Sequence, residues 1–217
     1  MKTSCQSRLK SIQLRLLHES LRKLGYSKHG NLYAYRESKL VRVIDLNKST
    51  ISSKSEIDFT FDCGVYIPGV IAFYCSKSDS QLSQITDCCI HGRLGLLNED
   101  RRNKWWTIQE DDDDASAADD KVVADITRRL EMDAIPFLNR FRDPEHVIQF
   151  LSLPRIGNAA RVWPQSDAIS FCLAAIVASL HGTPAQAEEL IKAAIVKSRK
   201  TPVEEVVESV GKRLSRA

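Results

Sequence analysis

A change of hydrophobic period near residue 120 is the feature that most constrains how this chain folds. Between about residues 31 and 67, apolar and polar residues alternate, as in "EIDFTFDC", where Ile57, Phe59, Phe61 and Cys63 share one face. After residue 120, apolar residues recur every three or four positions, which is the spacing of helices. The sequence therefore predicts an α+β protein in which a sheet comes first and helices follow.

The first part of the chain reads as a helix packed on an antiparallel sheet. Apolar residues at helical spacing predict a helix over residues 5–24, and Gly25 is a natural C-terminal stop. Strands are predicted at 31–38, 39–47 and 55–69, with the last ending at Pro68 and Gly69, and further short strands at 70–75 and 84–97.

The second part reads as helices. Residues 120–141 predict a helix interrupted at Pro136, and Asp143 before Pro144 predicts the start of another. Two prolines and a glycine within 154–166 suggest a boundary, which gives an α+β domain over 1–153 and a helical C-terminal extension over 154–217. Three helices are expected in the extension: an apolar central one over 167–182, and two that begin with the capping boxes Thr183-Pro184-Ala185-Gln186 and Thr201-Pro202-Val203-Glu204.

Charge is distributed unevenly along the chain. The first 54 residues hold 12 lysines and arginines against 3 acidic residues, a local charge of +9. Residues 109–120 hold 7 acidic residues and no basic one, a local charge of −7, although the whole chain carries only +3. The basic end could attract polyanions, and the acidic run, which we expect to be a solvated loop, could imitate one.

Several segments, in a characteristic order and spacing, carry a resemblance to a known family. They are "LRKLGYSKHGNLYAYR", "LVRVIDLNKST", "FTFDCGVYIPG", "HGRLG", "KWWTIQ" and "AIPFLNRF". Over about residues 5–151 the chain resembles the bacterial domain-of-unknown-function family 4304. The resemblance implies a cytosolic α+β domain without an established enzymatic activity. The acidic run and the C-terminal helices depart from the family's usual pattern and could serve a specialised partner.

No recognisable motif for catalysis, metal binding or cofactor binding is present. Cysteine and histidine in "CCIH", residues 88–91, are zinc-type donors, but Cys88 and Cys89 would point to opposite faces of a strand, and no CxxC spacing occurs. Packed free thiols are the favoured interpretation, so we predict no metal, no cofactor and no catalytic residue. An enzyme using the residues around "CCIH" stays open as an alternative, because residues distant in sequence can converge.

A nucleic-acid interface is a second alternative. The basic N-terminal face and the aromatic residues Tyr33, Tyr35 and Phe59 could bind a phosphate backbone and stack on bases. Those aromatic residues alternate as sheet-core residues do, so a solvated basic face is the simpler interpretation. Arg93 in "GRLG" could pair with a carboxylate across the sheet or bind an anion.

Two adjacent tryptophans beside the acidic run give the hypothesis that we favour. One ring of Trp105 and Trp106 can enter the core while the other lies on the surface, where tryptophan is a frequent interface anchor. The alternative is that both rings close the edge of the sheet. We therefore expect a protein partner, and the predicted contact residues are Arg93, Trp105, Trp106, Glu110, Asp111, Asp112, Asp113 and Asp114. The expected function is a non-enzymatic, cytoplasmic binding module, such as an immunity protein that neutralises a bacterial toxin.

The sequence also bears on where the chain acts. The N-terminal leucines are interrupted by Arg15, His18 and Glu19, so the apolar stretch of a signal peptide is missing. No segment approaches the roughly 18 apolar residues of a membrane span. We expect a cytosolic protein that does not bind a membrane, while its oligomeric state cannot be read from the sequence.

Overall fold

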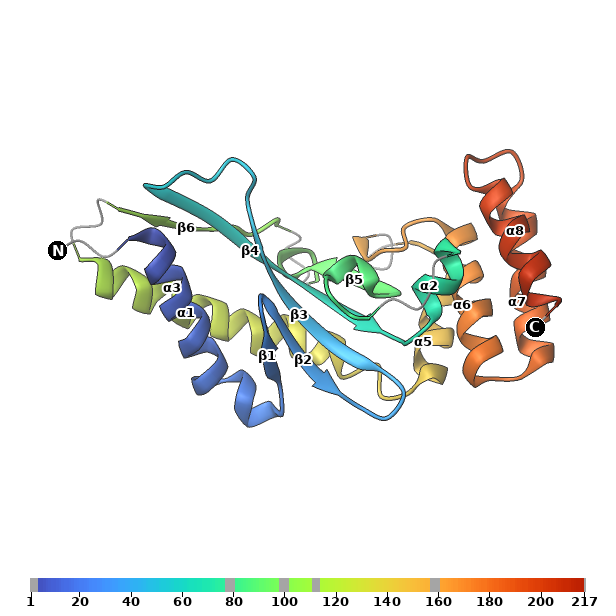
Figure 1. The fold of residues 1–217 in the computed structure, drawn as a ribbon, viewed down its shortest axis with the longest axis horizontal. Helices are drawn as coiled ribbons and strands as arrows, with labels where there is room; N and C mark the ends of the chain where they lie inside the picture. The colour runs from blue at the N-terminus through green and yellow to red at the C-terminus, as the bar shows by residue number, and fades with distance from the viewer. Residues whose placement is uncertain (1–3, 77–80, 98–101, 111–113, 157–160, 217) are drawn as a thin grey trace. The chain divides into compact units, whose positions relative to one another are not determined.

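A computed structural model describes residues 4–76, 81–97, 102–110, 114–156 and 161–216 (Figure 1). The chain groups into two compact units. The first unit comprises residues 1–36, 42–63 and 93–138, and the second comprises 37–41, 64–92 and 139–217. Residues 139–153 thus group with the C-terminal helices, while the domain boundary predicted at residue 154 stays a prediction.

The strands form the antiparallel sheet that the alternating pattern predicts. They are β1 (Ser27–His29), β2 (Leu32–Arg36), β3 (Val41–Lys48), β4 (Glu56–Tyr66), β5 (Ile90–Arg93) and β6 (Trp106–Gln109). The strand order is β1-β2-β3-β4-β5, and β6 pairs with the first part of β4. The register of that pairing places Ile57 opposite Ile108 and Phe59 opposite Trp106, so both strands turn the same apolar face toward the core.

The N-terminal α-helix is shorter than predicted, but the helical segment as a whole stops at Gly25, as expected. Helix α1 spans Cys5–Glu19, and a 3₁₀ turn, η1 (Leu21–Leu24), completes the predicted segment. Gly25 follows with φ of 86°, and a Cβ there would lie 2.9 Å from the Tyr35 ring. Both the backbone conformation and the lack of space therefore require glycine at this position.

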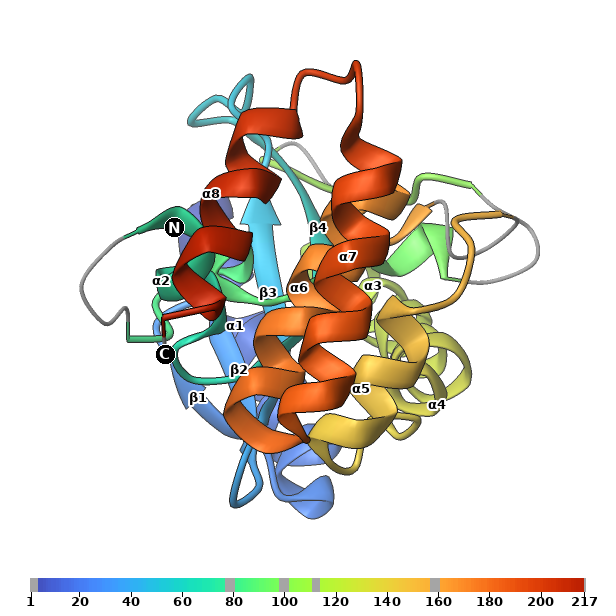
Figure 2. The same cartoon turned by 90° about the vertical axis from the view of Figure 1, so that its right-hand side faces the viewer.

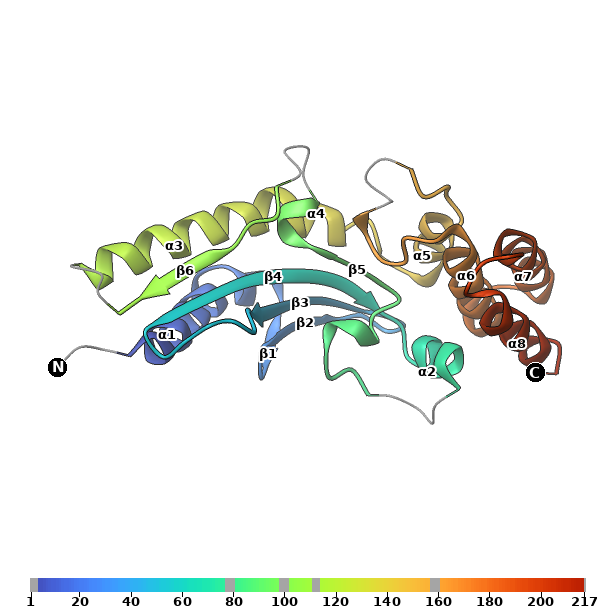
Figure 3. The same cartoon turned by 90° about the horizontal axis from the view of Figure 1, so that it is seen from above.

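The first unit places α1 and α3 (Ala115–Arg129) beside its strands (Figure 3). The apolar side of α1 buries Cys5, Leu9, Ile12 and Leu16, while β4 buries Ile57, Phe59, Phe61 and Cys63 as its alternation predicts. Within α3, Val123 and Ile126 are buried as well. These side chains form the core of the first unit because each element has one apolar face to remove from water.

The helical segment around Pro136 is not interrupted as predicted. Helix α3 (Ala115–Arg129) continues into a π-helical turn, η4 (Leu130–Ala134), and then into α4 (Ile135–Leu138). Proline lacks an N–H and crowds the carbonyl four residues before it, so it ordinarily breaks a regular α-helix. The wider π turn directly before Ile135 changes the hydrogen-bond spacing there, so the helix continues through the proline.

Residues 70–75 were expected as a strand, and this expectation is wrong. They form the short helix α2 (Val70–Cys75), which begins after Gly69 in the left-handed conformation with φ of 82°. The Phe73 amide donates to the Gly69 carbonyl at 2.8 Å, which closes the first turn. The strand predicted over 84–97 is reduced to β5, flanked by the 3₁₀ turns η2 (Ile85–Asp87) and η3 (Leu94–Leu96).

The second unit contains the C-terminal helices, α5 (Pro144–Leu151), α6 (Asp167–His181), α7 (Pro184–Ser198) and α8 (Glu204–Leu214). Figure 2 shows α6, α7 and α8 side by side. Helix α6 is buried on nearly every side, including Leu173, Ile176 and Val177, which confirms it as the central helix. Within the described part of the chain, no helix is long and apolar enough to cross a membrane.

The two predicted capping boxes have different outcomes. Thr183 caps α7, because its hydroxyl accepts a hydrogen bond from the Gln186 amide at 3.2 Å. The box at Thr201 is wrong: α8 begins at Glu204, and the Thr201 hydroxyl instead donates to the Ser198 carbonyl at 2.6 Å. The carboxylate of Glu204 accepts from the Lys200 amide, so both polar side chains serve the turn before α8.

These different roles predict different sensitivities to mutation. Thr183→Ala should lower the free energy of unfolding by about 1 kcal/mol, because the α7 cap is lost. Thr183→Ser should keep most of the stability of the wild type, because its hydroxyl can also act as the cap. Thr201→Ala, which has the same sequence context, should cost less because that hydroxyl is not an N-cap. Urea unfolding of the three variants measures this, and equal losses for Thr183→Ala and Thr201→Ala would contradict it.

Candidate functional site

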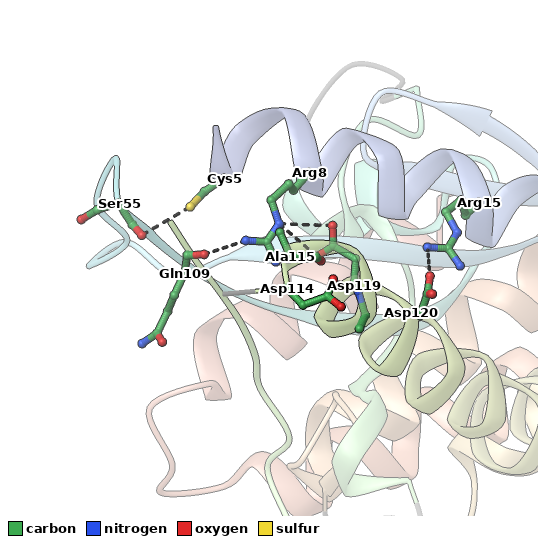
Figure 4. A network of polar contacts seen from close by, with 10 residues as sticks. Cys5, Arg8, Arg15, Ser55, Gln109, Asp114, Ala115, Asp119 and Asp120 are labelled. Atoms are coloured by element: carbon green, nitrogen blue, oxygen red, sulfur yellow. Dashed lines mark hydrogen bonds and ion pairs between the residues drawn. The ribbon is translucent and has the colours of Figure 1, made fainter. Parts of the chain in front are cut away.

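A buried ion pair joins the basic N-terminal helix to the acidic run. Arg8 on α1 and Asp119 on α3 approach to 2.8 Å, and their side chains are only 5% and 14% exposed (Figure 4). Arg8 also donates to the carbonyl oxygen of Gln109 at 2.6 Å and to that of Ala115 at 3.4 Å. The guanidinium therefore holds the end of β6 and the beginning of α3 at the same time.

A second, more exposed pair lies along the same helices. Arg15 donates to Asp120 at 2.8 Å and also lies 3.5 Å from Glu19, one helical turn further along α1 (Figure 4). The hydrogen bond with Asp120 raises the pKa of Arg15, and this outweighs the opposing effect of partial burial. Two of the N-terminal positive charges are thus paired with the last two carboxylates of the acidic run.

The acidic run is consequently not one continuous loop over 109–120. Gln109 ends β6, and α3 begins at Ala115 with Asp114 as its N-cap, whose carboxylate accepts from the Ala117 amide at 3.0 Å. Alanine is a strong helix former, so the small residues between the acidic groups favour a helix there. Glu110 is exposed, whereas Asp111, Asp112 and Asp113 lie outside the described residues.

Trp106 is the tryptophan of the pair that enters the core. It is 4% exposed, and its ring lies 6.1 Å from Phe59 and 5.9 Å from Phe61 between centroids. Its indole Nε1 donates to Asp125 on α3 at 2.9 Å. A partner-binding role for Trp106 would have to be indirect, because its ring fills space between β4 and α3 rather than facing solvent.

Asp125 is the polar group that secures Trp106. It also receives a hydrogen bond from Arg128 at 2.9 Å and lies 3.5 Å from Arg129 and 3.6 Å from Lys104. Partial burial by itself would raise the pKa of Asp125, but the hydrogen bonds from Trp106 and Arg128 and the nearby positive charges lower it on balance. The carboxylate therefore remains ionised where it accepts the indole hydrogen.

Trp105 lies on the opposite face of the sheet and is half-buried. The guanidinium carbon of Arg93 lies 5.0 Å from the centre of its ring, and Arg93 pairs with Asp62 on β4 at 3.4 Å. The side-chain oxygen of Asn103, with its amide turned to face both donors, accepts from Arg93 at 3.2 Å and from Trp105 Nε1 at 3.3 Å. Arg93, Asn103 and Trp105 thus form a fixed group, and the sequence expectation that Arg93 pairs with a carboxylate is confirmed.

Two carboxylates on β4 are held by neutral side chains of β6. The Asp58 carboxylate accepts from the Thr107 hydroxyl at 2.6 Å, and that of Glu56 accepts from the Gln109 amide at 2.7 Å. Both partners are neutral, so their hydrogen bonds fix the carboxylates without cancelling the charge. We refer to Glu56, Asp58, Trp105, Thr107, Gln109 and Glu110 as the β4–β6 surface. Trp105 and Glu110 were predicted from the sequence. Glu56 and Asp58 were not, although their place on the polar face of a strand was a signal for them.

The cysteines have the features of packed thiols. Cys63, Cys88, Cys89 and Cys172 are buried, and burial raises the pKa of Cys89 and that of Cys172 to about 12 each. His91 stacks on Trp163 at 5.2 Å between ring centroids. In the parts of the chain that the structure describes, no group of three His, Cys, Asp or Glu residues could hold a metal ion.

The buried Arg8–Asp119 pair makes a prediction about stability. Asp119→Ala should lower the free energy of unfolding by about 3 kcal/mol, because it removes a carboxylate that is paired with a buried guanidinium. Asp120→Ala is the matched control and should cost less than about 1 kcal/mol, because the Asp120 side chain is 61% exposed. Denaturant unfolding compares them, and similar losses in both variants would show that Asp119 has no special role.

Thiol reactivity tests the environment of the cysteines. Cys75 is exposed and should react rapidly with a chromogenic disulfide reagent at neutral pH. The other five, Cys5, Cys63, Cys88, Cys89 and Cys172, are buried and should react only as the protein unfolds. Mass spectrometry of the native labelled protein identifies the modified residue, and rapid labelling of Cys88 or Cys89 would contradict the burial that the structure assigns to them.

No curated protein and no solved structure matches the chain. A family model, described as Domain of unknown function (DUF4304), matches residues 17–140. This segment includes β1 to β6, all of α3 and α4, and the Trp105 group, whereas most of α1 and helices α5 to α8 lie outside it. With more than half of its length matched, the chain belongs to the DUF4304 family.

Proposed function

We propose that this protein is a non-enzymatic binding module that contacts another protein through the β4–β6 surface. The observation that carries the proposal is that Glu56 and Asp58 on β4 are held by the neutral side chains of Gln109 and Thr107 on β6, the strand that directly follows Trp105. Such carboxylates keep their charge and lose little side-chain entropy on binding, because they are already ordered. The surface thus offers an aromatic anchor and fixed negative charges to a partner.

Trp105 has the properties of an interface anchor. Its ring is half-buried and backed by Arg93, so it presents apolar area in a fixed orientation. Tryptophan and arginine are enriched among the residues that dominate binding energies. Trp106 supports this surface from the opposite face of the sheet, through its packing on Phe59 and its hydrogen bond with Asp125.

The charge of the surface favours a cationic partner. Glu56, Asp58 and Glu110 are acidic, and Asp111, Asp112 and Asp113 directly follow Glu110 in the sequence. Negative charges opposite a cationic cleft accelerate encounter and exclude an anionic substrate from it. We propose an immunity protein in the bacterial cytosol, which sequesters a toxin with a basic active site, such as a nuclease.

Capture from the native cytosol tests this proposal. The tagged full-length chain should retain a basic protein in stoichiometric amount, and the purified partner should bind the Glu56→Gln/Asp58→Asn variant at least about tenfold more weakly. Trp105→Ala should weaken binding by a similar or larger factor. Glu189→Gln/Glu208→Gln is a control with the same charge change on exposed residues of α7 and α8, and it should bind as the wild type does.

The toxin assignment has its own test. The captured protein should arrest growth when expressed alone in a heterologous host, and co-expression of this chain should restore growth. The Glu56→Gln/Asp58→Asn variant should restore growth less well. A captured partner whose affinity is unchanged in that variant and in Trp105→Ala would contradict the β4–β6 surface, and a harmless partner would contradict the immunity role.

A further inference from the structure

A second polar feature of the first unit is a pocket lined by lysines, separate from the residues of the β4–β6 surface. It has a volume of about 340 Å³. Helix α1, strand β1, the turn after it and the end of β3 contribute its walls. The lining residues are Gln6, Leu9, Lys10, Gln13, Leu14, Lys28, Gly30, Asn31 and Lys48. This volume lies near the lower end of small-molecule sites, which span roughly 300–1,000 Å³.

Three positive charges converge on the pocket from three different elements. Lys10 lies on α1, Lys28 on β1 and Lys48 on β3, and none of the lining residues is acidic. Across the described ranges of the chain, no carboxylate forms an ion pair with any of these three lysines. Arg8 and Arg15, by contrast, are paired with Asp119 and Asp120. Folding thus neutralises the arginines of α1 and leaves the lysines of the pocket with their charge.

Neutral groups hold two of the lysines in place. Lys48 Nζ donates to the Gln6 side-chain oxygen at 2.9 Å, and Lys28 Nζ donates to the Gly30 carbonyl at 2.5 Å. Each ammonium group has three hydrogens, so further donors remain after these single hydrogen bonds. The pocket therefore presents N–H donors with positive charge, which is the chemistry that recognises a compact anion of more than one negative charge.

The floor of the pocket combines a buried amide with apolar side chains. Gln13 is 6% exposed, and its Nε2 donates to the Asn31 side-chain oxygen at 3.3 Å, which orients the Asn31 amide hydrogens as additional donors. Leu9, which is buried, and Leu14, which is 52% exposed, also line the pocket. A ligand in the pocket would contact positive charges, amide donors and the apolar side chains of Leu9 and Leu14.

From these observations we propose that the pocket binds the phosphate group of a small phosphorylated molecule. A phosphate monoester carries between one and two negative charges at neutral pH and several acceptor oxygens, which matches three lysines and an amide. The organic part of the ligand would lie against Leu14. A nucleic-acid strand fits less well, because it requires a basic stripe along which several phosphates can lie, and Arg8 and Arg15 are neutralised.

NMR titration of the full-length chain tests the proposal. The probes are inorganic phosphate, adenosine 5′-monophosphate and a short single-stranded oligonucleotide, and the signals are the side-chain amides of Gln13 and Asn31. We expect adenosine 5′-monophosphate to shift both amides saturably at millimolar or lower concentrations, with weaker binding at higher salt. Binding of inorganic phosphate with equal affinity would identify free phosphate as the ligand and would still support the site.

Substitutions decide whether binding belongs to this pocket. Lys10→Gln/Lys28→Gln should weaken binding of adenosine 5′-monophosphate by about tenfold or more, because two charge-assisted hydrogen bonds are lost. Lys23→Gln/Lys54→Gln removes the same charge from exposed residues outside the pocket and should change affinity less than about twofold. All four lysines are at least partly exposed, so both variants should fold, which their amide spectra would show.

Three results would overturn the proposal. The first is the absence of any shift at Gln13 and Asn31 up to about 10 mM of the monophosphate, which corresponds to negligible affinity. The second is equal weakening by the pocket variant and the control variant, which would mean a general effect of charge. The third is oligonucleotide binding that is much tighter than monophosphate binding and weakened equally by both variants, which would favour an extended nucleic-acid face.

Discussion

The Arg8 guanidinium is the group on which the arrangement of the first unit depends most. It is buried, and it donates to Gln109 at the end of β6, to Ala115 at the start of α3 and to the Asp119 carboxylate. A buried positive charge is costly unless it is paired and its hydrogens are satisfied, so α1, β6 and α3 must approach together. This requirement links the N-terminal helix to a segment more than 100 residues further along the chain.

The same pairing determines which charges are available at the surface. Asp119 and Asp120 are paired with Arg8 and Arg15, so the net charge of the two sequence segments overstates what remains for a partner. Other charges are held by neutral groups: Asp58 by Thr107, Glu56 by Gln109, and Lys48 by Gln6. The carboxylates of the β4–β6 surface and the lysines of the pocket can therefore still attract a ligand, because neutral partners do not cancel their charge.

Prediction from sequence succeeded where the signal is local. The alternation in β4, the glycine stop after η1, the Asp143 cap of α5 and the Thr183 cap of α7 were all identified correctly. Prediction failed where contacts outside the local pattern determined the conformation. Residues 70–75 are apolar enough for a strand, but the chain turns at Gly69, and Thr201 has the pattern of a cap, but its hydroxyl bonds to Ser198. Pro136 was expected to break a helix that a π turn allows to continue.

By itself, the sequence determined the α+β class, the order of sheet and helices and the DUF4304 membership. These properties follow from hydrophobic period and side-chain alternation, which act between residues close in sequence. Only the tertiary structure decided that Trp106 enters the core, that Asp119 and Asp120 pair with arginines of α1, and that Lys10, Lys28 and Lys48 line one pocket. These outcomes depend on contacts between distant segments, whose register and burial no local pattern specifies.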